Sequence, residues 1–439
     1  MSSLNKYAYR QNTRATNHVG TAVNAISTEK QLTRLTLANM LWEDQFYMDG
    51  QSTHDLLKNL VAKADPAFVS NLAIMARTQF KLRHVPLALT RELARRQALP
   101  AHVLNAVIQR PDEMSEFLAL YWKDGRTPIS NQVKKGLAAA FTKFNEYQLA
   151  KWDKKSAAIR LRDVLFLTHP KPENKEREAL YKRIADDKME TPDTWETQLS
   201  AGADKAETFT RLMQEKKLGA LAFLRNLRNM VQAGISESTI KAYAKNLNVD
   251  KVLPFRYIAA ARIVPQFEDM LEEMMFRSLA SVPKLEGLTK LYVDVSSSMY
   301  APKVSEKSDL TRQDASLALA MLCAEICEKV EIYSFSGQAI RIPKLRGFAL
   351  ASAIKNSQRC SGTNLALSLR QTESVSDRVI VITDEQTNGA LSKPASGAKG
   401  YVINVASYQN GVNHDSWLTV TGFSEAVLDY ILAVEQEGL

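Results

Sequence analysis

The chain has 439 residues, with 57 Lys+Arg against 48 Asp+Glu, a formal net charge of +9 and an apolar fraction of 45%. This length exceeds what one hydrophobic core usually serves, so we expect two or three domains of a soluble globular protein. No apolar run reaches the roughly 18 residues of a membrane-spanning helix, and the polar, basic N-terminal segment predicts no signal peptide.

The positive charge is concentrated before Leu285. From Leu285 to the C-terminus there are 14 Lys+Arg and 17 Asp+Glu, which leaves 43 and 31 for the preceding residues. The first part therefore carries a net charge of +12 and the second a net charge of −3. This asymmetry indicates two domains with different partners, and polyanions are the usual partners of a basic surface.

The first part has a helical pattern. Apolar residues recur at helical spacing from about residue 28 to about residue 280, and turn signals such as Asp65-Pro66 separate the segments. Amphipathic helices are predicted over residues 32–47, 53–65, 66–80, 85–97, 100–110, 114–122, 129–144, 157–167, 218–231 and 264–279. Their loose pairing, without a fixed repeated motif, is typical of an α-solenoid or a ring of stacked helix pairs.

The pattern changes at Pro283. Short β-branched and aromatic runs alternate with helical patterns; the runs lie at residues 289–299, 329–337, 376–387, 400–407 and 416–424, and the helical patterns at 314–330, 348–358, 363–372 and 425–436. This alternation predicts an open parallel sheet with helices on both faces. Such sheets place their ligand sites at the carboxyl ends of the strands.

The three cysteines are too few for a disulfide framework. Cys323 and Cys327 lie four apart in a helical pattern, and Cys360 is distant in sequence. We expect all three to be reduced thiols in a cytoplasmic protein.

The stretch DVSSSM, residues 294–299, ends the first predicted strand and has three interpretations: a nucleophilic serine, a phosphate-binding loop or part of a metal site. A nucleophile needs a base and the glycines of a nucleophile elbow, whereas this part offers only His414 in a polar loop. A phosphate-binding loop needs glycines, and DVSSSM has none.

The metal interpretation needs oxygen ligands that point the same way. Asp294, Ser296 and Ser298 have the required spacing of two, and a hard cation would take further oxygens from Thr363 at a helix start and Asp384 directly after a strand. The alternative is that these side chains only cap turns and helices.

Together these five residues resemble the metal-ion-dependent adhesion site of von Willebrand factor A domains. The resemblance implies that Mg²⁺ or Mn²⁺ binds Asp294, Ser296, Ser298, Thr363 and Asp384, with one coordination position open to a carboxylate of a protein partner. No His or Glu is placed to act as a general base, so no catalytic residue is predicted.

The basic part has two segments in which arginines stand beside an apolar face, KKLGALAFLRNLRNM (216–230) and LPFRYIAAARI (253–263). Arg225 and Arg228 are three apart and share one side of a helix. A core helix with a solvated basic edge would explain them as well. With a von Willebrand factor A domain following, these segments, DQFY (44–47) and THPKP (168–172) resemble the TROVE module of the Ro 60 kDa autoantigen family.

This resemblance implies a mainly α chain with an α/β domain. Residues 1–284 would form a ring of HEAT-like helical repeats, and residues 285–439 a Rossmann-like von Willebrand factor A domain that closes it, in a monomer. Only Gly20 stands where the family commonly carries a Gly-Gly pair, and the short chain indicates a compact bacterial or phage-type member.

The implied function is non-catalytic RNA binding by a cytoplasmic ribonucleoprotein. Small non-coding (Y-like) RNA would lie on the outer basic surface and single-stranded 3′ ends of misfolded RNA in the central hole, for RNA quality control, with an exoribonuclease as a candidate partner and no membrane association. Two alternatives stay open: a metal-dependent scaffold that recruits an acidic protein, and a metal-dependent hydrolase. The absence of HExxH, a P-loop or paired catalytic carboxylates counts against the hydrolase.

Candidate RNA contacts come from three segments. By resemblance, Lys151, Lys155 and His169 fall on RNA-contacting positions of the family, with Arg160 and Arg162 nearby. The remaining candidates are basic residues on predicted helices: His84, Arg91, Arg95, Arg225 and Arg228. Such side chains neutralise phosphates and give salt-dependent affinity, although a solvated helix face is the simpler interpretation of each group.

Overall fold

The computed structural model describes residues 15–16, 22–23, 28–38, 50–250, 252–300, 311–358, 362–372, 374–384, 393–394, 397–405, 417–421 and 426–437. The chain divides into two compact units. Unit 1 comprises Met1–His54, Ala220–Arg228 and Ile240–Leu439, and unit 2 comprises Asp55–Gly219 and Asn229–Thr239. Several helices that precede Leu285 thus belong to the unit that contains the sheet.

Unit 2 is helical. Its elements are most of α3 (Gly50–Lys63), then α4 (Pro66–Thr78), α5 (His84–Arg95), α6 (Ala101–Val107), α7 (Asp112–Tyr121), α8 (Asn131–Phe141), α9 (Glu146–Trp152), α10 (Leu161–Thr168), α11 (Lys175–Ala185), α12 (Trp195–Ser200) and α13 (Lys205–Gln214), with the last turn of α14 (Ala220–Gln232) and the start of α15 (Glu237–Lys245). The described residues include no helix that is both long and apolar enough to cross a membrane.

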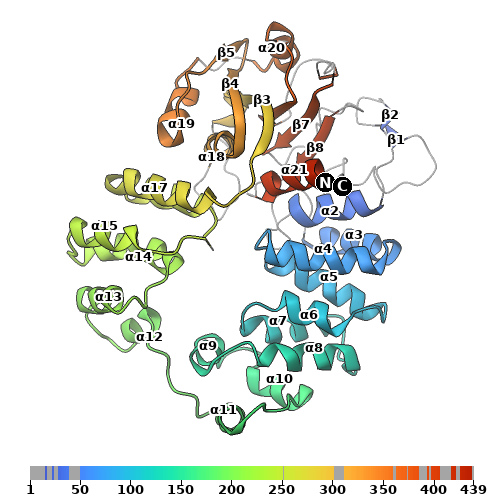
Figure 1. Cartoon of the computed structure of the whole chain (residues 1–439), viewed down its shortest axis with the longest axis vertical. Coiled ribbons are helices and arrows are strands. Elements are labelled where there is room, and N and C mark those ends of the chain that lie inside the picture. Colours follow the sequence, from blue (N-terminus) through green and yellow to red (C-terminus); the bar gives the residue numbers. More distant parts are fainter. Residues whose placement is uncertain are drawn as a thin grey trace. The chain divides into compact units, whose positions relative to one another are not determined.

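The helices of unit 2 pack as layers, visible from α4 to α10 in Figure 1. Helix α4 packs on α5 and α6, α6 on α8, and α10 on α7, α8 and α11. Side-chain caps set the helix starts: Asp65 accepts a hydrogen bond from the Phe68 amide at 2.9 Å, and Ser130 accepts one from the Val133 amide. Apart from α9, periodicity predicted these helices, and tertiary packing stabilises them.

The sequence pattern missed α9, α11, α12, α13 and α15. Helix α11 (KEREALYKRIA) is strongly charged and buries only Leu180, Tyr181 and Ile184, so its apolar stripe is too narrow to recognise by periodicity.

Unit 1 contains the sheet and the helices around it. The helices are α2 (Thr28–Ala38), most of α14 and α15, α16 (Phe255–Ile263), α17 (Glu268–Leu279), α18 (Arg312–Ile326), α19 (Gly347–Lys355), α20 (Leu365–Gln371) and α21 (Ala426–Glu437), with 3₁₀ turns at Pro265–Phe267 and Ser297–Met299. The short strands β1 (Ala15–Thr16) and β2 (Ala22–Val23) pair antiparallel with each other.

The six-stranded sheet has the order β5-β4-β3-β6-β7-β8. Its strands are β3 (Leu285–Asp294), β4 (Cys327–Phe335), β5 (Ala339–Arg341), β6 (Arg378–Thr383), β7 (Lys399–Asn404) and β8 (Trp417–Thr421). All neighbours are parallel except β5, which pairs antiparallel with β4 at the edge. The prediction of a mainly α chain with a Rossmann-like α/β part is confirmed, and the edge hairpin makes the sheet mixed instead of purely parallel.

One predicted boundary was wrong. The helical pattern was expected to continue to residue 330, but α18 ends at Ile326 and β4 begins at Cys327, where pairing with β3 replaces the helical hydrogen bonds. Cys323 and Cys327 are buried free thiols, and burial raises the pKa of both. Cys360 lies outside the described residues.

Polar contacts fasten α16 and α17 to the helices beside the sheet within unit 1. Arg262 on α16 forms an ion pair of 2.7 Å with Asp314 on α18. The Glu272 carboxylate on α17 accepts a hydrogen bond from the Phe348 amide of α19 at 2.6 Å. The preceding residue, Gly347, has a φ of +55°, and a Cβ there would collide with Glu272, so glycine is required for this close approach.

Candidate functional site

Cationic side chains lie over aromatic rings at several places between α6 and α10 of unit 2. On α9, Lys151 Nζ is 5.9 Å from the centroid of the Tyr147 ring, and on α10, the Arg162 guanidinium is 6.0 Å from that of Phe166. Both pairs are four residues apart, so each lies along one face of its helix. These distances are at the outer limit of a cation–π contact.

The Tyr147 and Phe166 rings are unusually open to solvent. The exposed fractions of these residues are 42% and 52%, respectively. Trp152, by contrast, is stacked under the Arg110 guanidinium at 3.7 Å, and Arg110 is itself held by Asp112 through bonds of 3.1 and 2.6 Å. Trp152 is thus part of the packing, whereas Tyr147 and Phe166 present ring surface to solvent.

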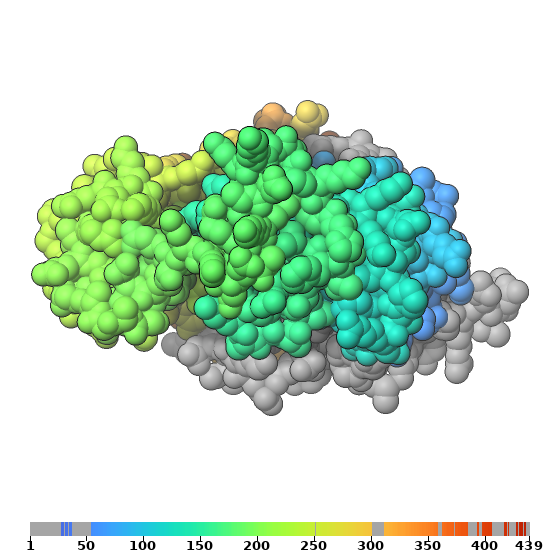
Figure 2. All heavy atoms as spheres, turned by 90° about the horizontal axis from the view of Figure 1, so that it is seen from below, coloured from blue at the N-terminus to red at the C-terminus, as the bar shows by residue number. Residues whose placement is uncertain are grey.

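The predicted residues of this segment lie on α9, in the link to α10, on α10 or at its C-terminus. Lys151, Lys155 and His169 are exposed and Arg162 is half-buried. We call Tyr147, Lys151, Lys155, Arg162, Phe166 and His169 the α9–α10 surface. In the space-filling view, residues coloured green, among them α11, lie on the face toward the viewer (Figure 2).

His169 has a left-handed backbone conformation. It caps the C-terminus of α10 with a φ of +47°, a left-handed conformation that costs most side chains about 1–2 kcal/mol. Glycine or asparagine would be the residue expected from the backbone alone.

Arg160 was predicted as an RNA contact, and its ion pairs argue against this. Its guanidinium binds Asp153 at 2.6 Å and Asp187 at 2.7 Å, and Asp153 also accepts a hydrogen bond from the Leu161 amide at 3.1 Å. The hydrogen bonds to Asp187 and Asp153 raise the pKa of Arg160. The residue therefore ties the end of α9 to the start of α10.

The prediction that Arg91 contacts RNA was wrong. Its side chain is completely buried and binds Glu92 at 2.7 Å and Asp124 at 2.8 Å, so it cannot reach a phosphate on the surface. Arg95 is partly exposed but binds the same Asp124 carboxylate at 2.5 Å. Its charge is therefore largely compensated within the protein.

His84 does not add a positive charge at neutral pH. Burial, followed by the neighbouring charges of Arg83 and Arg110, lowers its pKa to about 4. An RNA contact at this position would therefore be made by a neutral imidazole, and the predicted contact stays a prediction.

Arg225 and Arg228 on α14 are exposed, while Leu224 and Leu227 are buried. Leu221 was expected on the same apolar face but is 46% exposed. The helix thus has a buried apolar stripe and a basic solvent edge, and the described residues place no carboxylate within ion-pair distance of either arginine.

The five predicted metal ligands lie at one edge of the sheet in unit 1. Strand β3 ends at Asp294 and the neighbouring parallel strand β6 ends at Thr383. Asp384 is the next residue after β6 and therefore lies at the same end of the sheet as Asp294. The Thr383 hydroxyl donates to Asp294 Oδ2 at 2.6 Å, and the Ser296 amide donates to Asp294 Oδ1 at 2.8 Å. The hydroxyls of Ser296 and Ser298 are 3.2 Å apart.

Thr363 is held at this edge by contacts with the residue that follows β4. Strand β4 pairs with β3 on the side opposite β6. Ser336 lies directly after β4. Its hydroxyl donates to the Gly362 carbonyl at 3.2 Å, and its backbone carbonyl accepts a hydrogen bond from the Asn364 amide at 2.8 Å. Both neighbours of Thr363 are thereby fixed at the carboxyl end of β4. Ser336 is a positioning residue that the sequence pattern did not identify.

The chemistry of this edge fits a hard cation. Asp294 and Asp384 are completely buried, and Ser296 and Thr363 nearly so. Burial, with a contribution from the Asp384 charge, raises the pKa of Asp294 to about 6. Arg312 Nη1 lies 3.5 Å from Asp384 Oδ2 and supplies one positive charge. Two carboxylates and several hydroxyls are ligands that suit Mg²⁺ or Mn²⁺.

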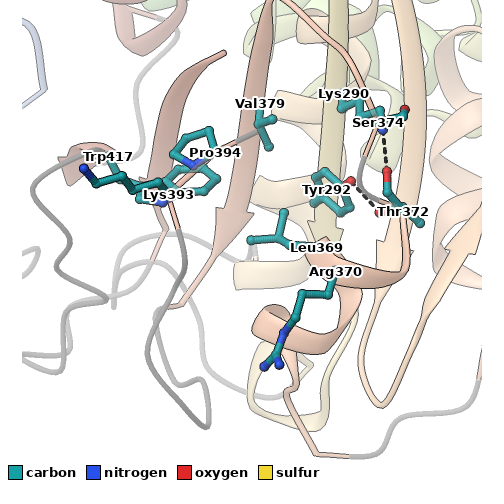
Figure 3. Close-up of a pocket in the computed structure, with 10 residues that line it drawn as sticks. All are labelled: Lys290, Tyr292, Leu369, Arg370, Thr372, Ser374, Val379, Lys393, Pro394 and Trp417. Carbon is teal, nitrogen blue, oxygen red and sulfur yellow. Dashed lines mark hydrogen bonds between the residues drawn. The ribbon is translucent and has the colours of Figure 1, made fainter. Parts of the chain in front are cut away.

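One face of the sheet carries a pocket beside α20 (Figure 3). Lys290, Tyr292, Val379 and Trp417 from the strands line it together with Leu369 on α20 and residues that follow that helix. Lys290 Nζ bonds to Ser374 Oγ at 2.5 Å, and the Tyr292 hydroxyl to that of Thr372 at 2.6 Å. These bonds anchor the end of α20, so the contacts have a structural role.

Comparison with known proteins gives one family and one fold. The TROVE domain family matches residues 182–329, about a third of the chain. Over 90 residues the chain is 32% identical to telomerase protein component 1 of Mus musculus and 31% identical to that of Rattus norvegicus. Each match covers 19% of this chain and only 3% of the relative.

Among solved structures, the chain is similar to the Ro (RSR) protein of Deinococcus radiodurans. The TM-score is 0.66 with 20% sequence identity, and the match covers 94% of this chain and 100% of that one. At 20% identity, this similarity establishes the fold alone.

Proposed function

We propose that this chain, a TROVE-domain protein with the fold of a bacterial Ro protein, is a non-catalytic RNA-binding protein. The observation that carries the proposal is the sorting of basic residues in unit 2. Arg91 and Arg160 are committed to carboxylates of the protein, whereas Lys151, Lys155 and His169 are exposed between α9 and the end of α10. Exposed cations beside aromatic rings are suited to phosphates and bases.

Salt dependence tests this proposal. Affinity for a hairpin RNA with a single-stranded 3′ tail should fall steeply between about 50 and about 200 mM salt, because phosphate contacts release counterions. Changing Lys151 and Lys155 to Ala should reduce the slope of log affinity against log salt by about 0.7 for each lost contact to a single strand. As a matched control, Lys399→Ala removes an exposed lysine of unit 1 and should leave affinity unchanged. A wild-type affinity that salt does not change would contradict the proposal.

The finer form of the proposal concerns the kind of RNA. Small non-coding RNA and single-stranded 3′ ends of misfolded RNA would be the ligands, in RNA quality control. Removing the 3′ tail from the same hairpin separates these two contributions, since only binding of an end depends on the tail.

We also propose that Asp294, Ser296, Ser298, Thr363 and Asp384 hold a divalent cation, in a part of the chain that acts as a von Willebrand factor A domain. The chain's own residues prepare the site: Ser336 fixes the loop of Thr363, and Thr383 orients Asp294. A bound Mg²⁺ or Mn²⁺ would offer positive charge to a carboxylate of a partner protein. The second candidate function is a metal-dependent scaffold that uses these five ligands. It predicts that the chain binds an acidic protein and that a chelator abolishes this binding.

A further inference from the structure

Two aromatic rings of the α9–α10 surface have no evident role in stability. Tyr147 and Phe166 are 42% and 52% exposed, although folding normally gains from burying such rings. Single exposed apolar residues are ordinary. Here, however, both rings stand on neighbouring short helices, and each has a cation four residues away on its own helix.

Trp152, unlike these two rings, is covered by another side chain. Trp152 is the last residue of α9, with Arg110 stacked 3.7 Å from its ring centroid. The Asp153–Arg160 pair fixes the link from α9 to α10. These contacts hold the backbone that carries the two rings, and a pre-formed backbone lowers the entropy cost of binding.

A flat ring with a cation beside it matches the chemistry of an unpaired nucleotide. Every base has a π-face that stacks on Tyr or Phe without regard to sequence, while the neighbouring phosphate is neutralised by Lys or Arg. In a continuous duplex the bases are already stacked on each other, so a duplex offers phosphates but no free base face.

We infer that Tyr147 and Phe166 are stacking platforms for unpaired bases, so that the α9–α10 surface binds single-stranded segments of RNA in preference to continuous duplex. Lys151 and Arg162 would hold the adjoining phosphates. This inference rests on the proposed RNA-binding function and specifies which feature of the RNA is recognised.

The test compares three RNAs of equal length: an unstructured oligouridylate, the same strand with abasic sites, and a perfect duplex. The double variant Tyr147→Leu/Phe166→Leu keeps apolar bulk but removes the rings. It should bind oligouridylate about 5-fold to 150-fold more weakly for each stacked base lost. Its affinity for the abasic strand and the duplex should be unchanged.

Two matched variants serve as controls. Tyr147→Phe/Phe166→Tyr keeps both rings and should bind all three RNAs as wild type does. Leu367→Ala removes an exposed apolar side chain of α20, in unit 1, and should also have no effect.

The outcomes separate the inference from the proposed function. If wild type binds none of the three RNAs, both fall. If wild type binds RNA but the Leu variant loses nothing, or loses affinity equally for all three, only the stacking platforms are refuted. Selective capture of an acidic protein by these rings, without RNA binding, would point to a protein partner and overturn the inference.

A second measurement does not depend on folding of the variants. Ultraviolet crosslinking of an iodouridine oligonucleotide to the wild-type protein, with the crosslinked peptides mapped by mass spectrometry, should label Tyr147 or Phe166. Labelling confined to other peptides would overturn the inference.

Discussion

Glu113 at the start of α7 is the centre of a buried polar network, and its replacement by Gln should destabilise unit 2. The carboxylate is completely buried and binds Arg77 Nη2 at 2.5 Å. Its other oxygen accepts the amides of Gln109 and Arg110 at 2.7 and 3.0 Å. One side chain thus connects α4, the segment after α6, and α7.

The substitution Glu113→Gln keeps the shape but removes the charge. Arg77, with only 11% of its side chain exposed, then loses the buried anion that compensates it. Removing one partner of a buried ion pair costs about 3–5 kcal/mol. Since Gln retains an oxygen for the backbone amides, we expect the lower end, about 3 kcal/mol. With an ordinary urea dependence, the unfolding midpoint of unit 2 should fall by on the order of 1–2 M.

The assay is urea unfolding read by hydrogen exchange of α4 to α7 amides, which isolates unit 2 from the rest of the chain. Glu215→Gln is the matched control, because Glu215 pairs with Arg211 and Lys217 at the surface. An exposed pair of this kind contributes little, because both charges stay hydrated and are screened by salt. If the two variants differ by less than about 1 kcal/mol, the network around Glu113 does not stabilise the unit as argued.

Three further predictions concern single side chains. Burial lowers the pKa of His84 from 6.5 to about 4, so the unfolded chain takes up a proton that the folded chain refuses; stability should fall as the pH drops from about 6.5 to about 4. Urea midpoints across that range should fall less steeply for His84→Gln, and equal slopes would show that His84 is not responsible. His169→Gly should raise the free energy of unfolding by about 1 kcal/mol by relieving the left-handed backbone, yet weaken RNA binding about threefold to tenfold if the imidazole donates one hydrogen bond to the RNA. Unchanged affinity would remove His169 from the interface. Mn²⁺ should raise the thermal midpoint of wild type and of Ser297→Ala but not of Ser298→Ala, and an equal response of both variants would contradict the proposed ligand set.

Arg91 and Lys151 show where the sequence pattern stops being informative. Arg91 was predicted from its place on an amphipathic helix and Lys151 from the family resemblance, and both were predicted to contact RNA. Asp124, which forms an ion pair with Arg91, lies 33 positions away on another segment. No local sequence pattern therefore reveals this pairing. The pairs Tyr147/Lys151 and Arg162/Phe166 were visible as spacings of four, but their exposure was not.

The sequence by itself determined what depends on short-range regularity. Apolar periodicity specified most helices and the change to an α/β part, and the spacing of two in DVSSSM placed Asp294, Ser296 and Ser298 at a strand end, where β3 does end. Only the tertiary structure decided which charges are internal, because burial and ion pairing are set by residues distant in the chain. It also decided that Ser336 positions Thr363 and that two aromatic rings remain uncovered, since each depends on which elements become neighbours.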